Sequence, residues 1–328
     1  MLKSKKTKPV VFKLESKNGF FAVFKLFNKY YLKSFFGPFF AFVFPIIILS
    51  ILGSLMPIQL IFPGIVAMTS MSVGTMGMPL SILEIKQSVL LKRIGASPIK
   101  PKIFTFVIIT YFLFVMILAI LWILLWGIIL NSGSAKLWAL FDNLATIKGF
   151  FGFFIGNLSN IILSLSVGFF VATIAKNPVK AQAIAMMIYF PSAFLSGQFI
   201  DIGTISNSSF MNVISQLMPF RYTSMQVITS FNGESIFSYN DISFPHVIKF
   251  SQLLSGKYKV TELIGAYHGM DIHTVSNTLI TNKGNPPLLV SRLVYKSWEV
   301  IVAFIYPVVL SISAITLSIK KFRWSTRN

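Results

Sequence analysis

Long apolar runs separated by polar connections make up most of this chain. Crossing the hydrocarbon of a bilayer takes about 20 apolar helical residues. Runs of roughly that length cover residues 35–56, 60–80, 103–130, 148–175, 182–200 and 299–319. They are apolar on all sides and lack the alternation of membrane β-strands. The pattern therefore predicts an all-α membrane protein with six transmembrane helices.

Residues 1–34 precede the first run and are strongly basic. In 18–34, Lys25, Lys29 and Lys33 recur every four residues, which places them on one face of a helix and leaves Phe, Leu and Tyr on the other. This pattern is typical of a helix lying along a membrane surface. We expect a cytoplasmic N-terminus with an interfacial helix, the alternative being a simple basic flank of the first span.

A polar and basic segment, 81–102, separates the second and third runs. Ser81 and Glu84 have the spacing of a capping box, which predicts a helix start. Gly95 followed by Pro98 predicts the end of that helix. The segment is expected to be a cytoplasmic helix between two spans, the alternative being an ordinary basic loop that fixes topology.

The second run contains small residues at helical spacing. These are Gly64, Ala67, Ser70, Gly74 and Gly77. Small side chains let helix backbones approach closely in a membrane. The surface they form could serve packing inside one bundle, a translocation path or a dimer interface, and the sequence leaves these open.

From 201 to about 298 the chain has no run of span length. Its first part, to about 230, contains short apolar helix-like pieces and is expected to be a re-entrant outer segment that belongs with helices 1–5 in a unit 35–230. Residues 231–297 are expected to form an extracytoplasmic insert, and 298–328 the last span and a cytoplasmic tail. The three histidines, His246, His268 and His273, all lie in the insert, but their spacing makes a poor metal site, so no metal is expected.

The net charge of +20 is distributed very unevenly. The segments 1–34, 82–102, 176–180 and 320–328 hold 20 of the 29 basic residues but only two of the nine acidic ones. Short basic loops remain on the cytoplasmic side of a membrane. The charge thus predicts a multi-pass protein with both termini cytoplasmic and contacts to membrane lipids, and gives no reason to expect nucleic acid as a partner.

Several kinds of chemistry are disfavoured by what the sequence lacks. There is no cysteine, which excludes disulfides and thiolate catalysis. The interiors of the six runs carry no Asp, Glu, His or Arg, whereas ion-coupled carriers use such groups inside the membrane. No P-loop signature G-x-x-x-x-G-K-[ST] is present either. We expect a chain that is not an enzyme and holds no cofactor, and that takes any energy for uphill transport from a separate protein.

Three motifs in order resemble those of the permeases of type-2 ATP-binding-cassette exporters. The stretch LLKRIGASPIKPKIF resembles that family's inner loop after the second span, with Glu84 where an acid is common upstream. A Ser-Gly pair near the outer end of span five and the element MPFRY follow in the same order. The resemblance covers about 1–230 and 297–328, and the long insert departs from it.

The resemblance implies a membrane subunit of an ATP-driven exporter in the plasma membrane of a bacterium. Cytoplasmic ATP-binding-cassette ATPase subunits and a second permease copy or paralogue would be its partners. Coupling to the ATPase would involve Glu84, Lys92, Arg93, Ser97 and Pro98. The translocation path or dimer packing would involve Ser70, Gly74, Gly77, Ser196 and Gly197. A passive channel or carrier for neutral solutes is the alternative function, and a membrane-embedded enzyme is a more remote one.

Overall fold

The fold is helical across its membrane part. The computed structural model describes residues 17–55, 58–87, 101–130, 141–200, 205, 209–231, 243–248, 263–265, 289–294 and 297–321. The helices are α1 (Lys17–Lys33), α2 (Phe36–Pro38), α3 (Phe44–Leu55), α4 (Ile58–Met71), α5 (Met78–Gln87), α7 (Pro101–Leu130), α8 (Ile147–Ile174), α9 (Pro178–Leu195), α11 (Ser209–Leu217), α12 (Arg221–Phe231) and α15 (Ser297–Lys321). Two π-helical segments, η1 (Phe39–Val43) and η2 (Ser72–Gly77), join α2 to α3 and α4 to α5, and a 3₁₀ turn, η3 (Asp142–Ala145), precedes α8.

Five of the described helices are long and apolar enough to cross a membrane. They are Phe36–Ser54, Ile61–Ile85, Thr105–Leu130, Ile147–Ile174 and Ile301–Ser318. Helix α9 covers most of the fifth predicted run but is not among them. It has 18 residues, and Lys180 near its start and Pro191 within it make it less apolar than the others. The six-span count therefore remains a prediction.

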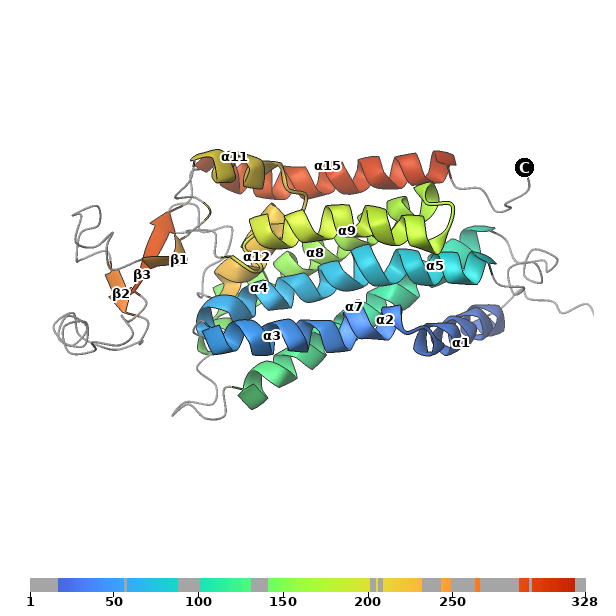
Figure 1. Cartoon of the computed structure of the whole chain (residues 1–328), viewed down its shortest axis with the longest axis horizontal. Helices are drawn as coiled ribbons and strands as arrows, with labels where there is room; N and C mark the ends of the chain where they lie inside the picture. The colour runs from blue at the N-terminus through green and yellow to red at the C-terminus, as the bar shows by residue number, and fades with distance from the viewer. Residues whose placement is uncertain are drawn as a thin grey trace, which may run out of the picture.

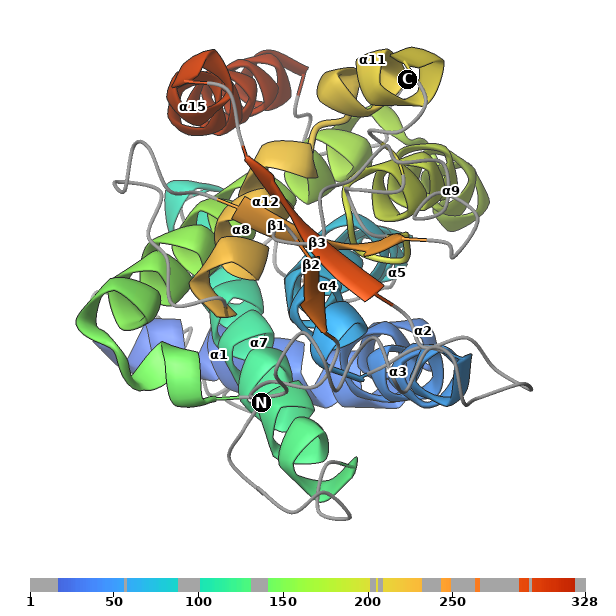
Figure 2. The ribbon, with the colours of Figure 1, turned by 90° about the vertical axis from the view of Figure 1, so that its left-hand side faces the viewer.

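The second predicted span is the central helix of the bundle. Segments α4, η2 and α5 follow one another without a break from Ile58 to Gln87, and every residue from 61 to 83 is buried. Helices α3, α7, α8, α9 and α12 contact this central helix (Figures 1 and 2). A helix with so many small residues can be enclosed in this way because neighbouring backbones approach it closely.

Each π-helical segment ends next to a proline that lacks the next backbone donor. The N–H of Phe44 bonds to the carbonyl of Phe39, five residues back, so the next carbonyl, that of Phe40, would need an N–H from Pro45. In its place Ser72 Oγ of the central helix donates to Phe40 O at 2.7 Å. An unpaired carbonyl in a membrane interior costs several kcal/mol. This hydrogen bond thus fixes the first span against the central helix.

A proline also follows the π-helical turns of the central helix itself. Met78 N–H bonds to Val73 O, and the carbonyl of Gly74 would next require an N–H from Pro79. Gly168 of α8 lies directly against that carbonyl, since a Cβ added at Gly168 would overlap Gly74 O. Only glycine fits this contact between α8 and η2.

Helix α1 is held against α7 by aromatic side chains. Phe24 and Tyr31 pack edge-on against Tyr111, with ring centroids 5.2 and 5.5 Å apart. Tyr31 OH donates to the carbonyl of Gly37 at 2.8 Å, and burial, with a smaller contribution from Tyr111, raises the pKa of the Tyr31 phenol, so the hydroxyl stays protonated. The predicted lysine face is exposed on the same helix.

The insert contains strands, so the expected all-α architecture applies only to the membrane part. Strands β1 (Ser243–Ile248), β3 (Leu289–Val294) and β2 (Leu263–Gly265) form an antiparallel sheet in the order β1-β3-β2. Ser243 pairs with Val294, and Leu263 pairs with Ser291. Figure 1 shows this sheet at one end of the bundle, and α1, the end of α5 and the end of α15 at the other.

We predict that Gly168→Ala destabilises the protein and that Gly53→Ala does not. The added methyl at 168 meets a backbone carbonyl, whereas nothing lies within 4 Å of one at 53. Forcing such a contact should lower the free energy of unfolding by about 1–3 kcal/mol. Thermal unfolding in detergent measures this, and equal transition temperatures for the two variants would contradict the packing described.

Candidate functional site

The predicted coupling segment begins as the end of the central helix. Ser81 does not cap a helix, because it is buried in the interior of α5 and its Oγ donates to Gly77 O, four residues back, at 2.9 Å. The capping-box interpretation of Ser81 and Glu84 was therefore wrong: the helix had already begun upstream, and Pro79 is accommodated after the π-helical turns. Glu84 is half-buried, one turn before the last described residue of α5. The other coupling candidates, Lys92, Arg93, Ser97 and Pro98, lie outside the described residues.

The small residues proposed for the path are buried inside the single chain. Ser70 is fully buried and accepts a hydrogen bond from α8. A Cβ at Gly74 would lie 2.5 Å from Cβ of Ser164 in α8, and one at Gly77 would lie 3.7 Å from Gly37 O. Within the chain these three residues permit close helix packing, the first of the alternatives that the sequence left open.

Ser196 and Gly197 form the end of α9 beside the central helix. Gly197 has φ 81°, a left-handed conformation that favours glycine and ends the helix. Its carbonyl and that of Gln198 lie 2.8 Å from where a Cβ of Gly64 would stand. The Ser-Gly pair thus brings the turn after α9 into direct contact with α4.

Helix α12 is polar and yet fully buried. All 11 of its residues, RYTSMQVITSF, are buried. Its side chains reach different neighbours: Gln198 Nε2 donates to Ser224 Oγ at 2.7 Å, and Gln226 Nε2 donates to Ala303 O of α15 at 2.7 Å. Buried polar groups persist in a membrane when they find such partners. Helix α12 therefore joins the turn after α9 to the last span.

A second polar centre lies at Asn160 in the middle of α8. Its Nδ2 donates to Ala67 O and to Ser70 Oγ of the central helix, both at 2.7 Å. Its Oδ1 accepts from Thr223 Oγ1 of α12 at 2.9 Å. The fully buried amide thus links three helices with all three hydrogen bonds short.

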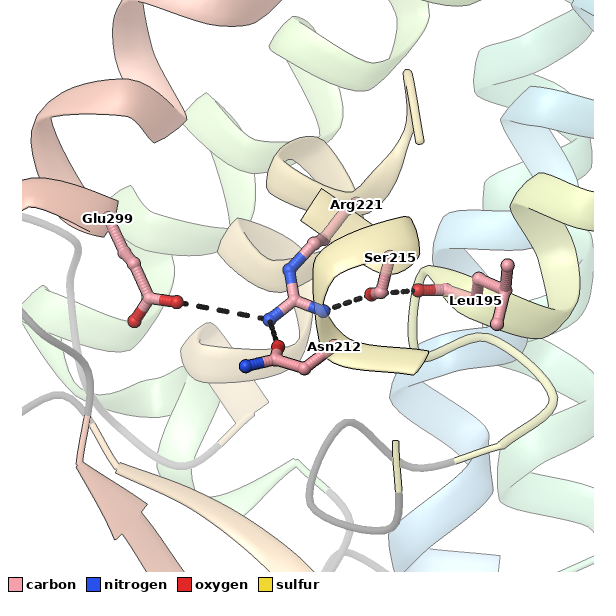
Figure 3. A network of polar contacts seen from close by, with 5 residues as sticks. All are labelled: Leu195, Asn212, Ser215, Arg221 and Glu299. Carbon is pink, nitrogen blue, oxygen red and sulfur yellow. Dashed lines mark hydrogen bonds and ion pairs between the residues drawn. The ribbon is translucent and has the colours of Figure 1, made fainter. Parts of the chain in front are cut away.

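The charged centre at the end of the bundle that carries the sheet is Arg221, which is 1% exposed. Figure 3 shows its guanidinium between Glu299 at the start of α15, with Nη2 and Oε1 4.0 Å apart, and Ser215 of α11, to which Nη1 donates. Nη2 also donates to Asn212 Oδ1 at 3.3 Å. Ser215 in turn donates to Leu195 O at the end of α9. One cation thereby connects α9, α11, α12 and α15.

These polar centres were missed by sequence reasoning that looked for ionisable groups inside apolar runs. Glu299 is the first residue of the last run, 299–319, so the prediction that the runs contain no acidic residue was wrong there. The carboxylate is tolerated because it is buried beside Arg221. Asn160 could have been flagged as an amide in an otherwise apolar run. The polar sequence of α12 gave no signal of burial.

Metal ligation finds no support in the residues described, where no group of three His, Asp or Glu side chains gathers. Among the histidines, His246 lies in β1, while His268 and His273 are outside the described residues. No catalytic residue had been predicted.

Comparison with known families settles the class. The profile of the ABC-2 type transporter family matches residues 20–231, more than half of the chain. The chain belongs to this family. A search of curated proteins and a search of solved structures each found no match.

The family assignment makes this chain a membrane-spanning permease component of an ABC transporter, as the inner-loop, Ser-Gly and MPFRY motifs had indicated. The matched range runs from α1 to Phe231, the last residue of α12. It includes the central helix, Asn160 and Arg221. The insert with its sheet, and α15 with Glu299, follow the matched range.

We predict that Arg221→Met destabilises the ABC-2 permease and that adding Glu299→Leu recovers a large part of the loss. Removing one member of a buried ion pair costs about 3–5 kcal/mol, whereas replacing both with apolar side chains is often tolerated. Thermal unfolding in detergent reports both variants, with the exposed Lys148→Met as a control for loss of a positive charge. A double variant no more stable than Arg221→Met would contradict the pairing.

Proposed function

We propose that this ABC-2 permease is the membrane subunit of an ATP-driven exporter that couples to separate cytoplasmic ATPase subunits through segment 81–102. The observation that carries the proposal is the continuous helix from Ile58 to Gln87. One end of this helix leads directly into the basic segment, and the remainder is enclosed by the bundle. A force applied at Gln87, the last described residue of this helix, therefore acts on the centre of the permease.

The charge at this end supports docking of a protein partner. Lys92 and Arg93 follow the half-buried Glu84, and Lys25, Lys29 and Lys33 of α1 are exposed at the same end of the bundle. Arg and Lys can pair with carboxylates on an ATPase surface. In this proposal Glu84, Lys92, Arg93, Ser97 and Pro98 are coupling residues, and α1 lies along the inner leaflet.

The membrane arrangement proposed has six crossings, with α9 as the fifth, and both termini in the cytoplasm of a bacterium. The exposed lysines of α1 and the end of α15 lie at the end opposite the sheet, which fits the positive-inside rule. A second copy or a paralogue completes the path. Because Ser70, Gly74, Gly77, Ser196 and Gly197 are buried or helix-ending residues, we propose that they shape the path by positioning α4 and α9. The outward direction of transport rests on the motif resemblance.

The test is assembly with candidate ATPase subunits from the same cell in lipid nanodiscs. Lys92→Glu/Arg93→Glu is expected to lower the amount of co-purified ATPase at least about tenfold, because it reverses two charges at the docking segment. Lys148→Glu, an exposed charge at the start of α8, is the matched control and should bind normally.

Two outcomes would overturn the proposal. One is equal loss of ATPase binding in both variants. The other is a wild-type chain that binds no ATPase yet passes neutral solutes in liposomes, which would establish the passive channel or carrier instead.

A further inference from the structure

The Asn160 amide is the most completely bonded polar group in the described interior of the permease. Both of its N–H groups are used, on Ala67 O and Ser70 Oγ, and its oxygen accepts from Thr223. The residue is fully buried. No water competes for these bonds in a membrane interior, so a displacement that breaks one leaves a buried polar group without a partner.

On either side of Asn160, helix α8 packs closely against its neighbours. One turn earlier on α8, a Cβ at Gly156 would stand 2.9 Å from Val227 N of α12. Two turns later, Gly168 lies against the carbonyl of Gly74 in η2. Helix α8 is thus in backbone contact with α12 on one side and with the central helix on the other. Packed interfaces of this kind shift between discrete arrangements or move as one body.

Resting on the proposed function, we propose that Asn160 is a positioning residue that couples the central helix to α12. Movement imposed on segment 81–102 would pass along α5, η2 and α4 to Ser70, and through the Asn160 amide to Thr223. Helix α12 carries it onward to the last span, because Gln226 donates to Ala303 O and Arg221 pairs with Glu299. The amide is the step of this route at which one residue of α8 bonds to both the central helix and α12.

The outer end of this route can be followed with a spin label. Phe210 on α11 is 70% exposed, and the natural chain has no cysteine. Helix α11 is tied to Arg221 through Asn212 and Ser215. A nitroxide on Phe210→Cys therefore reports movement of this end without interference from other thiols of the permease, provided the ATPase subunits are made cysteine-free.

The experiment records the change in the nitroxide spectrum when ATP is added to the permease–ATPase complex, together with the rate of ATP hydrolysis. With Thr223→Val the spectral change should fall about threefold or more, within the range seen for residues of coupling networks, while hydrolysis continues. Thr223→Ser keeps the hydroxyl and should restore the change. Thr69→Val is the matched control, since Thr69 is equally buried but its hydroxyl bonds only to Ile65 O of its own helix.

A structural defect alone would lower ATP hydrolysis and the spectral change together. In that case the spectral change in Thr223→Ser and Thr69→Val would follow how far each substitution lowers the unfolding temperature. A full spectral change in Thr223→Val overturns the proposal, as does a wild-type label that does not respond while ATP is hydrolysed. A wild-type permease that binds no ATPase overturns the proposed function itself, which distinguishes the two failures.

Discussion

Burial of one helix without water is the constraint on which the rest of this permease depends. The central helix, Ile58–Gln87, is surrounded by other helices of the bundle, so its polar groups must be paired inside the protein. Thr69 and Thr75 return their hydroxyls to their own backbone, and Ser72 donates to Phe40. The prolines that follow η1 and η2 remove backbone donors. Ser72 donates a hydrogen bond to the carbonyl of Phe40 in the first case, and Gly168 packs directly against the carbonyl of Gly74 in the second. The prolines, which in the sequence look like helix breakers, therefore lie at sites where neighbouring helices contact each other.

The end of the permease that carries the sheet follows a second rule, in which polar side chains replace apolar packing. Helix α12 is buried along its whole length and uses Arg221, Thr223, Ser224 and Gln226 to reach four neighbours. Hydrogen bonds between membrane helices are individually modest, about 0.6 kcal/mol on average in one measured case. Their value here lies in geometry, because each one specifies which helix α12 faces. Such a connected network holds α11, α12 and α15 in one arrangement relative to the core.

The sequence was informative wherever a single physical signal dominated. Five of the six apolar runs predicted the positions of candidate spanning helices, and lysine spacing predicted the exposed face of α1, because burial in a membrane and solvation of charge are strong and local. The inner-loop and MPFRY motifs indicated the family that the profile match then established. The continuity of α4 and α5 was not predicted. A Ser-x-x-Glu sequence inside a helix cannot be told from a capping box at a helix start by sequence alone. Nor were Asn160 and the Arg221–Glu299 pair found, since their partners lie more than 60 residues away in sequence and only the folded chain brings them together. The strands of the insert carried no alternation strong enough to predict them.

We propose that the central helix is the rigid element that links the proposed ATPase-docking end of the permease to the end that carries the sheet. Hydrogen–deuterium exchange of the permease–ATPase complex, with and without ATP, tests this most directly. We expect the amides of 61–83 to exchange slowly in both states, while ATP changes exchange at 81–102 and also in α11 and α12. A change confined to the cytoplasmic segment, or rapid exchange throughout η2, would contradict the account.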